Sequence, residues 1–335
     1  MRRFNYCIGI DVSKKTLDVS VLSEDVNATK TVHYKIENSE KSISQFVKKT
    51  LSKCDLEQTL FCFEDTGIYS FPLSYYLSTN ELAYWKVSSL EVKRSRGISR
   101  GKDDKIDSKD IAFYAHRHLD KFRPSRLPSK AIQQLKLLFT EREKVLKSLS
   151  SFEKTSENKD FTTKDVFNVV ASVNASVIKK LEQALKVIEE KMLAIIAAES
   201  TLNQQYTLIT SIPGIGRQTA IYILIATRGF ETFENWRQLA CYSGVAPFPY
   251  QSGTSIRGRN KVHPLADKKL KSLLNMCALV AIRHDKELKT YYDRKVAEGK
   301  SKMLVINNVR CKLLARVFAV INRKTTFINT YKFAS

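Results

Sequence analysis

The stretch FNYCIGIDVSKK, residues 4–15, decides the fold that this sequence predicts. Side chains alternate between the two faces of a strand, and a buried first strand here would carry Tyr6, Ile8, Ile10 and Val12 on one face and Cys7, Gly9 and Asp11 on the other. An aspartate at the end of an apolar strand is costly unless something uses its charge, as a metal ion would. A turn-forming aspartate is the alternative, so the positions of the other carboxylates matter.

The residues up to 124 predict an α/β domain that opens with antiparallel strands and continues with crossover strands. Ser39 is expected to cap the first helix, which runs to about Leu51. The expected strands cover residues 4–12, 16–22, 30–36, 59–63 and 82–87, and a further helix covers residues 71–78.

More carboxylates follow at places where they can meet Asp11. Glu64 ends a second apolar strand, and Asp104 and Asp107 lie three residues apart at the start of a helix, so they point to one side. Oxygen ligands select hard ions, which predicts Mg²⁺ or Mn²⁺. Two such ions about 3.5–4 Å apart can assist cleavage of a phosphodiester. The alternative for Asp104 and Asp107 is that they are helix N-terminal acids favoured by the dipole.

Residues 125–200 predict a helical hairpin. Apolar residues recur at heptad spacing in two arms, with Arg142 at one missing position; they are Leu135, Leu138, Val145, Leu149 and Phe152, then Ile178, Leu181, Leu185, Ile188, Met192 and Ile195. The polar residues 155–160 are expected to form the turn. The hairpin is either a spacer or dimer arm, or an ordinary intramolecular helical pair.

Residues 201–335 predict a mostly helical domain. Its segment LITSIPGIGRQTA, residues 208–220, is typical of a helix–hairpin–helix, in which Pro213, Gly214, Gly216 and Arg217 would approach a nucleic-acid phosphate. A tight turn between packed helices is the alternative. Basic amphipathic helices are expected at residues 266–284 and 302–322.

The intervening loop, residues 243–261, holds several hydroxyl groups beside Arg257, Arg259 and Lys261. A serine here is either a nucleophile toward phosphate, with the guanidinium groups stabilising developing charge, or a phosphate contact without a catalytic role.

The charge balance predicts a polyanionic partner. The net charge is +22, and residues 251–335 alone hold 19 lysines and arginines against five acids. Six scattered cysteines without a C-x-x-C pair favour a reducing cytoplasm over a zinc site or a disulfide framework. No apolar run is long enough for a membrane span, and the N-terminus leads into a strand instead of a signal sequence.

Taken in order, these motifs resemble those of DEDD-type insertion-sequence transposases, the insertion-sequence 110 family of bridge-RNA-guided recombinases. The resemblance covers nearly the whole chain. It rests on GIDVSK (9–14), FEDTGIY (63–69), GKDDKIDS (101–108), SIPGIG (211–216), GVAP (244–247) and QSGT (251–254).

The resemblance implies a RuvC-like (RNase H-type) domain over residues 1–124, a coiled-coil hairpin over 125–200 and a transposase domain over 201–335. The implied acidic tetrad is Asp11, Glu64, Asp104 and Asp107, with Asp104 taken over Asp103 and Asp107 over Asp110. The implied nucleophile is Ser252, which would form a covalent phosphoserine intermediate with DNA while metal-bound carboxylates assist.

The implied partners are double-stranded DNA of the element ends and target, a structured guide RNA, and further copies of the chain as dimers that pair into a tetramer. The implied location is the bacterial cytoplasm and nucleoid. This sequence departs from the family at Ser108, where alanine is common, and at residues 261–267, where a basic glycine turn is common.

Three other functions compete with DNA recombination. One is a junction-resolving nuclease that uses the RuvC-like centre with water, and another is a basic nucleic-acid-binding protein without catalysis. An actin-like ATPase also opens with a GIDVS-type strand, but it needs later glycine-rich phosphate loops. The 11 glycines of this chain form no such loop after residue 120 except at 213–216.

Overall fold

The chain divides into two compact units, residues 1–127 and 128–335. The computed structural model describes residues 4–25, 28–50, 55–95, 103–154, 161, 163–246, 248–252, 256–261 and 266–329, with the backbone alone at 24–25, 28–30, 50, 248–252 and 256–261. Within these residues, no helix has the length and apolar character that crossing a membrane requires.

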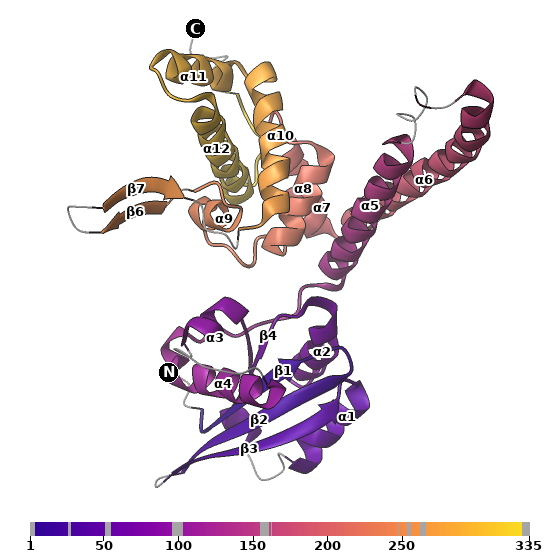
Figure 1. Cartoon of the computed structure of the whole chain (residues 1–335). Coiled ribbons are helices and arrows are strands. Elements are labelled where there is room, and N and C mark those ends of the chain that lie inside the picture. Colours follow the sequence, from indigo (N-terminus) through magenta and orange to yellow (C-terminus); the bar gives the residue numbers. More distant parts are fainter. Residues whose placement is uncertain are drawn as a thin grey trace. The chain divides into compact units, whose positions relative to one another are not determined.

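Unit 1 is built on one mixed five-stranded sheet, in the order β3-β2-β1-β4-β5 (Figure 1). Its strands are β1 (Tyr6–Val12), β2 (Thr16–Asp25), β3 (Ala28–Glu37), β4 (Thr59–Glu64) and β5 (Tyr84–Val87). The first three pair antiparallel, and β4 and β5 continue the sheet in parallel. The predicted α/β layout with an antiparallel start is confirmed.

Helices cover both faces of this sheet (Figure 1). On one face, α1 (Glu40–Gln45), a π-helical turn (Phe46–Thr50) and α2 (Phe71–Thr79) pack on Ile8, Ile10 and Val12 of β1. On the other face lie α3 (Ser89–Ser95), which the sequence did not predict, and α4 (Asp104–Arg117). Short 3₁₀ turns occupy Leu56–Gln58, Gly67–Ser70 and Leu119–Lys121. The predicted cap is present, because the Ser39 side chain accepts from the Ser42 amide.

Helix α4 lies in direct backbone contact with β1. A Cβ atom placed on Gly9 would stand 2.2 Å from both the Ala112 nitrogen and the Ser108 carbonyl oxygen. Only glycine permits so close an approach. A buried hydrogen bond of 2.8 Å between the hydroxyls of Ser20 and Ser108 ties α4 to β2 as well. Ser108 therefore contributes a contact that alanine lacks.

Unit 2 begins with two long helices, α5 (Lys130–Lys154) and α6 (Lys164–Ala198), which pack against each other (Figure 1). Arg142, at the missing heptad position, donates from Nε to Glu189 Oε1 at 2.7 Å across the pair. The expected turn at 155–160 lies outside the described residues.

The remaining elements of unit 2 are helical apart from one hairpin. The helices are α7 (Ser200–Thr210), α8 (Arg217–Thr227), α9 (Trp236–Tyr242), α10 (Lys268–His284), α11 (Lys286–Ala297) and α12 (Lys302–Arg323). They share one apolar core with the N-terminal part of α5 and the C-terminal part of α6. Where the sequence predicted a loop, the structure has strands β6 (Phe248–Ser252) and β7 (Ile256–Lys261). Periodicity misses such short strands because Phe248, Tyr250 and Ile256 are the only large apolar residues in them.

We predict that Gly9→Ala destabilises the chain by about 3 kcal/mol or more, because the new methyl group would push α4 off the sheet. Denaturant unfolding of the purified variant measures this loss. Gly216→Ala is the matched control: no atom lies within 4 Å of its added Cβ, and the expected cost is about 1 kcal/mol for a poorer N-cap. Equal losses for both variants would contradict the proposed tight contact.

Candidate functional site

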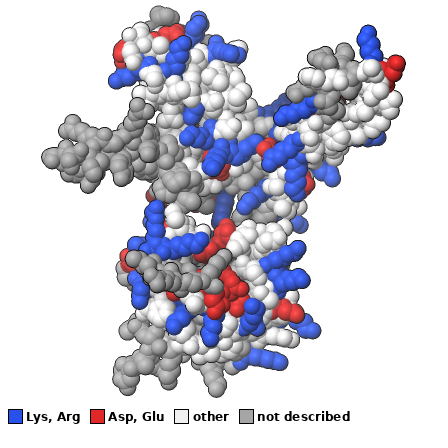
Figure 2. Space-filling view, in the orientation of Figure 1, with Lys and Arg blue, Asp and Glu red and all other residues white. Residues whose placement is uncertain are grey.

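Three carboxylates lie in one row across the sheet, on the face that α4 covers. Asp11 of β1 pairs with Asp18 of β2. Glu64 follows Phe63, the partner of Ile10 in β4, and therefore lies level with Asp11. Side chains at the same level of neighbouring strands stand about 5 Å apart. Figure 2 shows the acidic side chains of unit 1 gathered in the region of β1 and α4, with lysines and arginines around them.

The first turn of α4 adds Asp104 and Asp107 to this row. The pKa of Asp11 is raised to about 6 by burial first, and then by repulsion from Asp104, Asp107, Glu64 and Asp18. The structure thus brings Glu64, Asp104 and Asp107 close enough to Asp11 to oppose its ionisation.

Nearby acids have other roles. Asp103 caps α4, because its Oδ1 accepts from the Lys105 amide at 3.2 Å. Asp65 closes the turn after β4, because its Oδ1 accepts from the Ser70 hydroxyl at 3.0 Å. These contacts favour Asp104 over Asp103, and Glu64 over Asp65, as members of the acidic site.

Asp18 is a member of the acidic row that the sequence reasoning missed. Its carboxylate is buried, with 4% of the residue exposed, and it meets His33 Nε2 at 3.1 Å and Lys35 Nζ at 3.3 Å on β3. The sequence signal for Asp18 was the short connection between the first two predicted strands. A tight hairpin over residues 13–16 pairs Asp11 with Asp18.

The donor chemistry of this site fits a hard divalent cation. The tetrad offers only carboxylate oxygens, which suit Mg²⁺ and Mn²⁺, and an ion would relieve the repulsion that raises the pKa of Asp11. Within the described part of the chain, no three His, Cys, Asp or Glu side chains converge closely enough to hold a metal as they stand.

The predicted nucleophile, Ser252, is the last residue of β6 and pairs with Ile256 across the hairpin. Arg257, Arg259 and Lys261 occupy alternate positions of β7. The side chains of these residues lie outside the description, as does the whole of Ser255. Ser243 is fully buried, and its hydroxyl donates to the Ala240 carbonyl at 3.2 Å. Ser243 is therefore poorly placed to attack a phosphate.

Hydrogen bonds fix the chain at the start of this hairpin. The Val245 carbonyl accepts from Asn307 Nδ2 of α12 at 2.6 Å. Asn307 Oδ1 in turn accepts from the buried Arg310 at 3.3 Å, and Arg310 also donates to Asn275 of α10.

Asp267 fixes the chain after the hairpin. Its Oδ1 accepts from the Leu270 amide at 2.8 Å and caps α10, and its Oδ2 accepts from the Tyr222 hydroxyl at 2.9 Å. Asp267 belongs to the segment in which this sequence departs from the family, so a defined contact is present there despite the departure. Residues 262–265 of the segment lie outside the description.

The predicted helix–hairpin–helix corresponds to α7, a turn at 211–216 and α8. Gly214 has a φ of +93°, and an added Cβ would stand 2.6 Å from Ala281 Cβ in α10, so close packing explains this glycine. The Gly216 amide bonds to the buried Cys277 thiol. Arg217 and Gly216 are exposed, whereas Pro213 is half-buried. The turn is thus packed on α10 and offers one exposed basic side chain.

Comparison with known proteins identifies relatives over both units. Residues 8–157 match a family model described as transposase, of the DEDD type of IS110 elements, and residues 206–293 match the model of the transposase IS116/IS110/IS902 family. The pilin gene-inverting proteins of Moraxella bovis and Moraxella lacunata are each 26% identical over 330 residues, or 96% of this chain and 97% of theirs. An insertion element IS110 protein of Streptomyces coelicolor is 29% identical over 45% of this chain and 38% of its own length.

We predict that Asp11→Asn stabilises the metal-free chain by about 1–2 kcal/mol at pH 7.5, after allowance for solvent screening. The folded pKa of Asp11 lies above its ordinary value, so the folded chain holds an extra proton between about pH 4 and 6 and loses stability as the pH rises through 6. The gain should therefore vanish near pH 4. Denaturant unfolding across this range measures it.

Mg²⁺ should raise the stability of the wild type at pH 7.5 and leave Asp11→Asn nearly unchanged, because the variant lacks one ligand. Asp293→Asn, at an exposed acid of α11, is the control and should respond to Mg²⁺ as the wild type does. An Asp11→Asn chain with the same pH profile and Mg²⁺ response as the wild type would rule out the acidic site.

Proposed function

This chain belongs to the IS110 family of DEDD transposases, and we propose that it recombines DNA with two centres, the acidic tetrad of unit 1 and Ser252 of unit 2. It is a DNA transposase or recombinase. The observation that carries the proposal is the gathering of Glu64, Asp104 and Asp107 around the partly buried Asp11, where β1, β4 and the first turn of α4 meet. The sheet order and the helix across its face support a RuvC-like (RNase H-type) domain.

The tetrad would hold Mg²⁺ or Mn²⁺, in keeping with the divalent-metal dependence that the DEDD family suggests. A bound ion supplies charge neutralisation at the phosphate under attack. The protein's own part is to place the carboxylates. The contact of Gly9 with α4 fixes the distance between the strand acids and the helix acids.

Ser252 would attack a backbone phosphorus atom. A bond forms between its Oγ and phosphorus, the bond from phosphorus to one deoxyribose oxygen breaks, and the serine proton ends on that oxygen. Arg257, Arg259 and Lys261 would stabilise the charge on the phosphoryl oxygens. Reversal of the step with an oxygen of another strand rejoins the DNA. The relatives named for inverting a pilin gene are in keeping with cutting followed by rejoining.

The strongly basic C-terminal region supports nucleic acid as the partner of unit 2. We propose double-stranded DNA at the element ends and target, and a structured guide RNA transcribed from the element. Arg217, exposed beside Gly216 at the start of α8, is the described basic residue of the 211–217 turn that can reach a phosphate. Gly214 and Pro213 would act by shaping this turn.

The hairpin of α5 and α6 is proposed as a dimer arm, with pairs of dimers forming a tetramer. The first half of α6 exposes a stripe of valines at helical spacing, namely Val166, Val169, Val170 and Val173. A contiguous apolar stripe on an exposed helix is typical of an interaction surface.

We predict that wild type and Ser252→Ala differ in a covalent-adduct assay. The protein is mixed with RNA from the flanks of its element, element-end DNA and Mg²⁺, and is then run on a denaturing gel. The wild type should give a protein–DNA band, and Ser252→Ala should lose it by at least ~100-fold, because the nucleophile is gone. Ser243→Ala is the control and should keep the band.

Cleaved DNA without an adduct in either protein would contradict the serine mechanism and favour a water-using nuclease. An adduct that survives Ser252→Ala would exclude Ser252 and move the assignment to Ser255. A basic binding protein without catalysis would bind DNA without any Mg²⁺-dependent turnover.

We predict that replacing the valine stripe weakens self-association. The triple variant Val166→Ser, Val170→Ser and Val173→Ser should raise the dimer dissociation constant by about 10-fold or more, as expected for the loss of at least about 1.4 kcal/mol of apolar burial. Sedimentation velocity measures this. Leu137→Ser on α5, where the side chain is also exposed, is the control. Unchanged association in the triple variant would show that the hairpin is only an intramolecular pair.

A further inference from the structure

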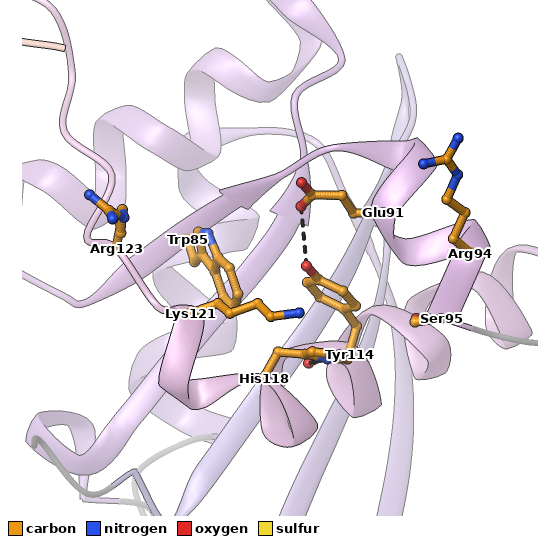
Figure 3. Close-up of a pocket in the computed structure, with 8 residues that line it drawn as sticks. All are labelled: Trp85, Glu91, Arg94, Ser95, Tyr114, His118, Lys121 and Arg123. Atoms are coloured by element: carbon orange, nitrogen blue, oxygen red, sulfur yellow. Dashed lines mark hydrogen bonds between the residues drawn. The ribbon is translucent and has the colours of Figure 1, made fainter. Parts of the chain in front are cut away.

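A second concave site lies in unit 1 away from the carboxylates, between α3, β5 and the C-terminal half of α4. Its cavity measures about 490 Å³ and is drawn in Figure 3. A smaller cavity of about 280 Å³ shares Ser95 and Tyr114 with it and is otherwise lined by Asp110, Phe113 and Arg117. Cavities of a few hundred Å³ are large enough for small ligands or for a part of a polymer.

Aromatic rings form one side of the larger cavity. Trp85 and Tyr114 lie 5.5 Å apart between ring centroids, and His118 stacks on Tyr114 at 4.5 Å with 25° between the planes. Trp85 and Tyr114 are almost fully buried, whereas His118 is half-buried. The Tyr114 hydroxyl donates to Glu91 Oε2 at 3.1 Å, which holds the ring in place (Figure 3). A fixed group of aromatic rings, in which the partly exposed His118 stacks on Tyr114, suits a planar ligand.

Positive charge surrounds these rings. Arg94, Lys121 and Arg123 line the cavity and are exposed, and none of the three forms an ion pair with any residue that the structure describes. The one acid of the lining is Glu91, whose carboxylate already accepts from Tyr114. Burial, with Glu91 next, raises the pKa of Tyr114 to about 12, so its hydroxyl keeps its proton at neutral pH. The lining therefore favours an anion attached to a flat ring.

The cavity is connected to the acidic site through α4 itself. His118 is the C-cap residue of α4 and follows Asp107 by eleven residues, which corresponds to about 16 Å along the helix axis. Asp107, Tyr114 and His118 follow the spacing of a single helix face. Both sites belong to unit 1, so this separation is built into one rigid element.

We propose that the α3–α4 cavity binds an unpaired nucleotide of a single-stranded nucleic acid, its base against the His118 ring and its phosphates between Lys121, Arg123 and Arg94. The proposal deepens the proposed function and rests on it, because it places a strand next to the acidic site. A base inside a duplex has both faces covered, so a concave site with a ring at its wall selects an unpaired one. The same chemistry occurs in single-stranded DNA and in unpaired RNA.

The test is fluorescence anisotropy of the full chain with labelled oligonucleotides of one sequence, as single-stranded DNA, single-stranded RNA and duplex DNA. Lys121→Ala/Arg123→Ala should weaken single-strand binding about 10-fold. It should also lower the salt slope of log K by about 1.4, or roughly 0.7 for each lost phosphate contact. Lys41→Ala/Lys48→Ala is the control with equal charge change, at exposed lysines of α1 and the π-helical turn on the other face of the sheet. It should stay within about 2-fold.

The ring is tested separately. His118→Ala should weaken binding of single strands about 5-fold, within the range of one lost stacking contact, and His118→Phe should restore it because a flat ring remains. A 5-iodouracil oligonucleotide should crosslink to the 113–123 peptide. A loss confined to DNA or to RNA identifies which strand uses the cavity, and either result supports the proposal.

Three results would overturn the proposal. They are unchanged single-strand affinity and salt slope in Lys121→Ala/Arg123→Ala, an equal loss in the control pair, or an equal loss for duplex DNA. Asp11→Asn separates this proposal from the proposed function, since it should lose DNA cleavage and bind single strands as the wild type does. Cleavage by Asp11→Asn would contradict the function alone, whereas normal binding by the cavity variant would contradict the cavity alone.

Discussion

The site of unit 1 depends on a backbone contact between β1 and α4. At Gly9 the helix comes so close that no side chain fits between them. This contact sets the height of α4 above the sheet, and the buried Ser20–Ser108 hydrogen bond fixes the helix against β2. As a result, the first turn of α4 lies above the end of β1. Carboxylates from a strand end and from a helix start are then close neighbours, and burial, followed by repulsion from these neighbours, raises the pKa of Asp11.

Local rules predicted most of unit 1 correctly. Alternation in residues 4–12 correctly predicted the first strand. Ser39 was correctly predicted to cap the first helix, and α4 was correctly predicted to begin near Asp104. The sequence could predict that Asp11, Glu64, Asp104 and Asp107 lie near one another, because strand ends and helix starts meet at the same edge of such a sheet. Asp18 was missed because its role depends on hairpin register, and α3 because seven residues are too few to show a period. The α3–α4 cavity is lined by residues of β5, α3 and α4, which tertiary packing brings together. No single segment of the sequence therefore predicts it.

Unit 2 shows how packing can change the meaning of a motif. Gly214 belongs to a segment typical of phosphate-binding turns, yet its missing side chain makes room for α10. The segment with Ser252 was expected to be a loop, and it is a hairpin whose two ends are fixed by Asn307 and Asp267. Short strands with few large apolar residues carry little periodicity, so their pairing is visible only in the structure.

The most direct test of this account is the position of a bound metal. Crystals of the chain grown with Mn²⁺ and measured at the manganese absorption edge would show each ion as an anomalous peak. We expect a peak within ~2.0–2.3 Å of carboxylate oxygens from Asp11 and Glu64 and from at least one of Asp104 and Asp107. Strong Mn²⁺ peaks elsewhere, with none between β1, β4 and α4, would contradict the claim that the close approach of α4 builds a metal-dependent centre.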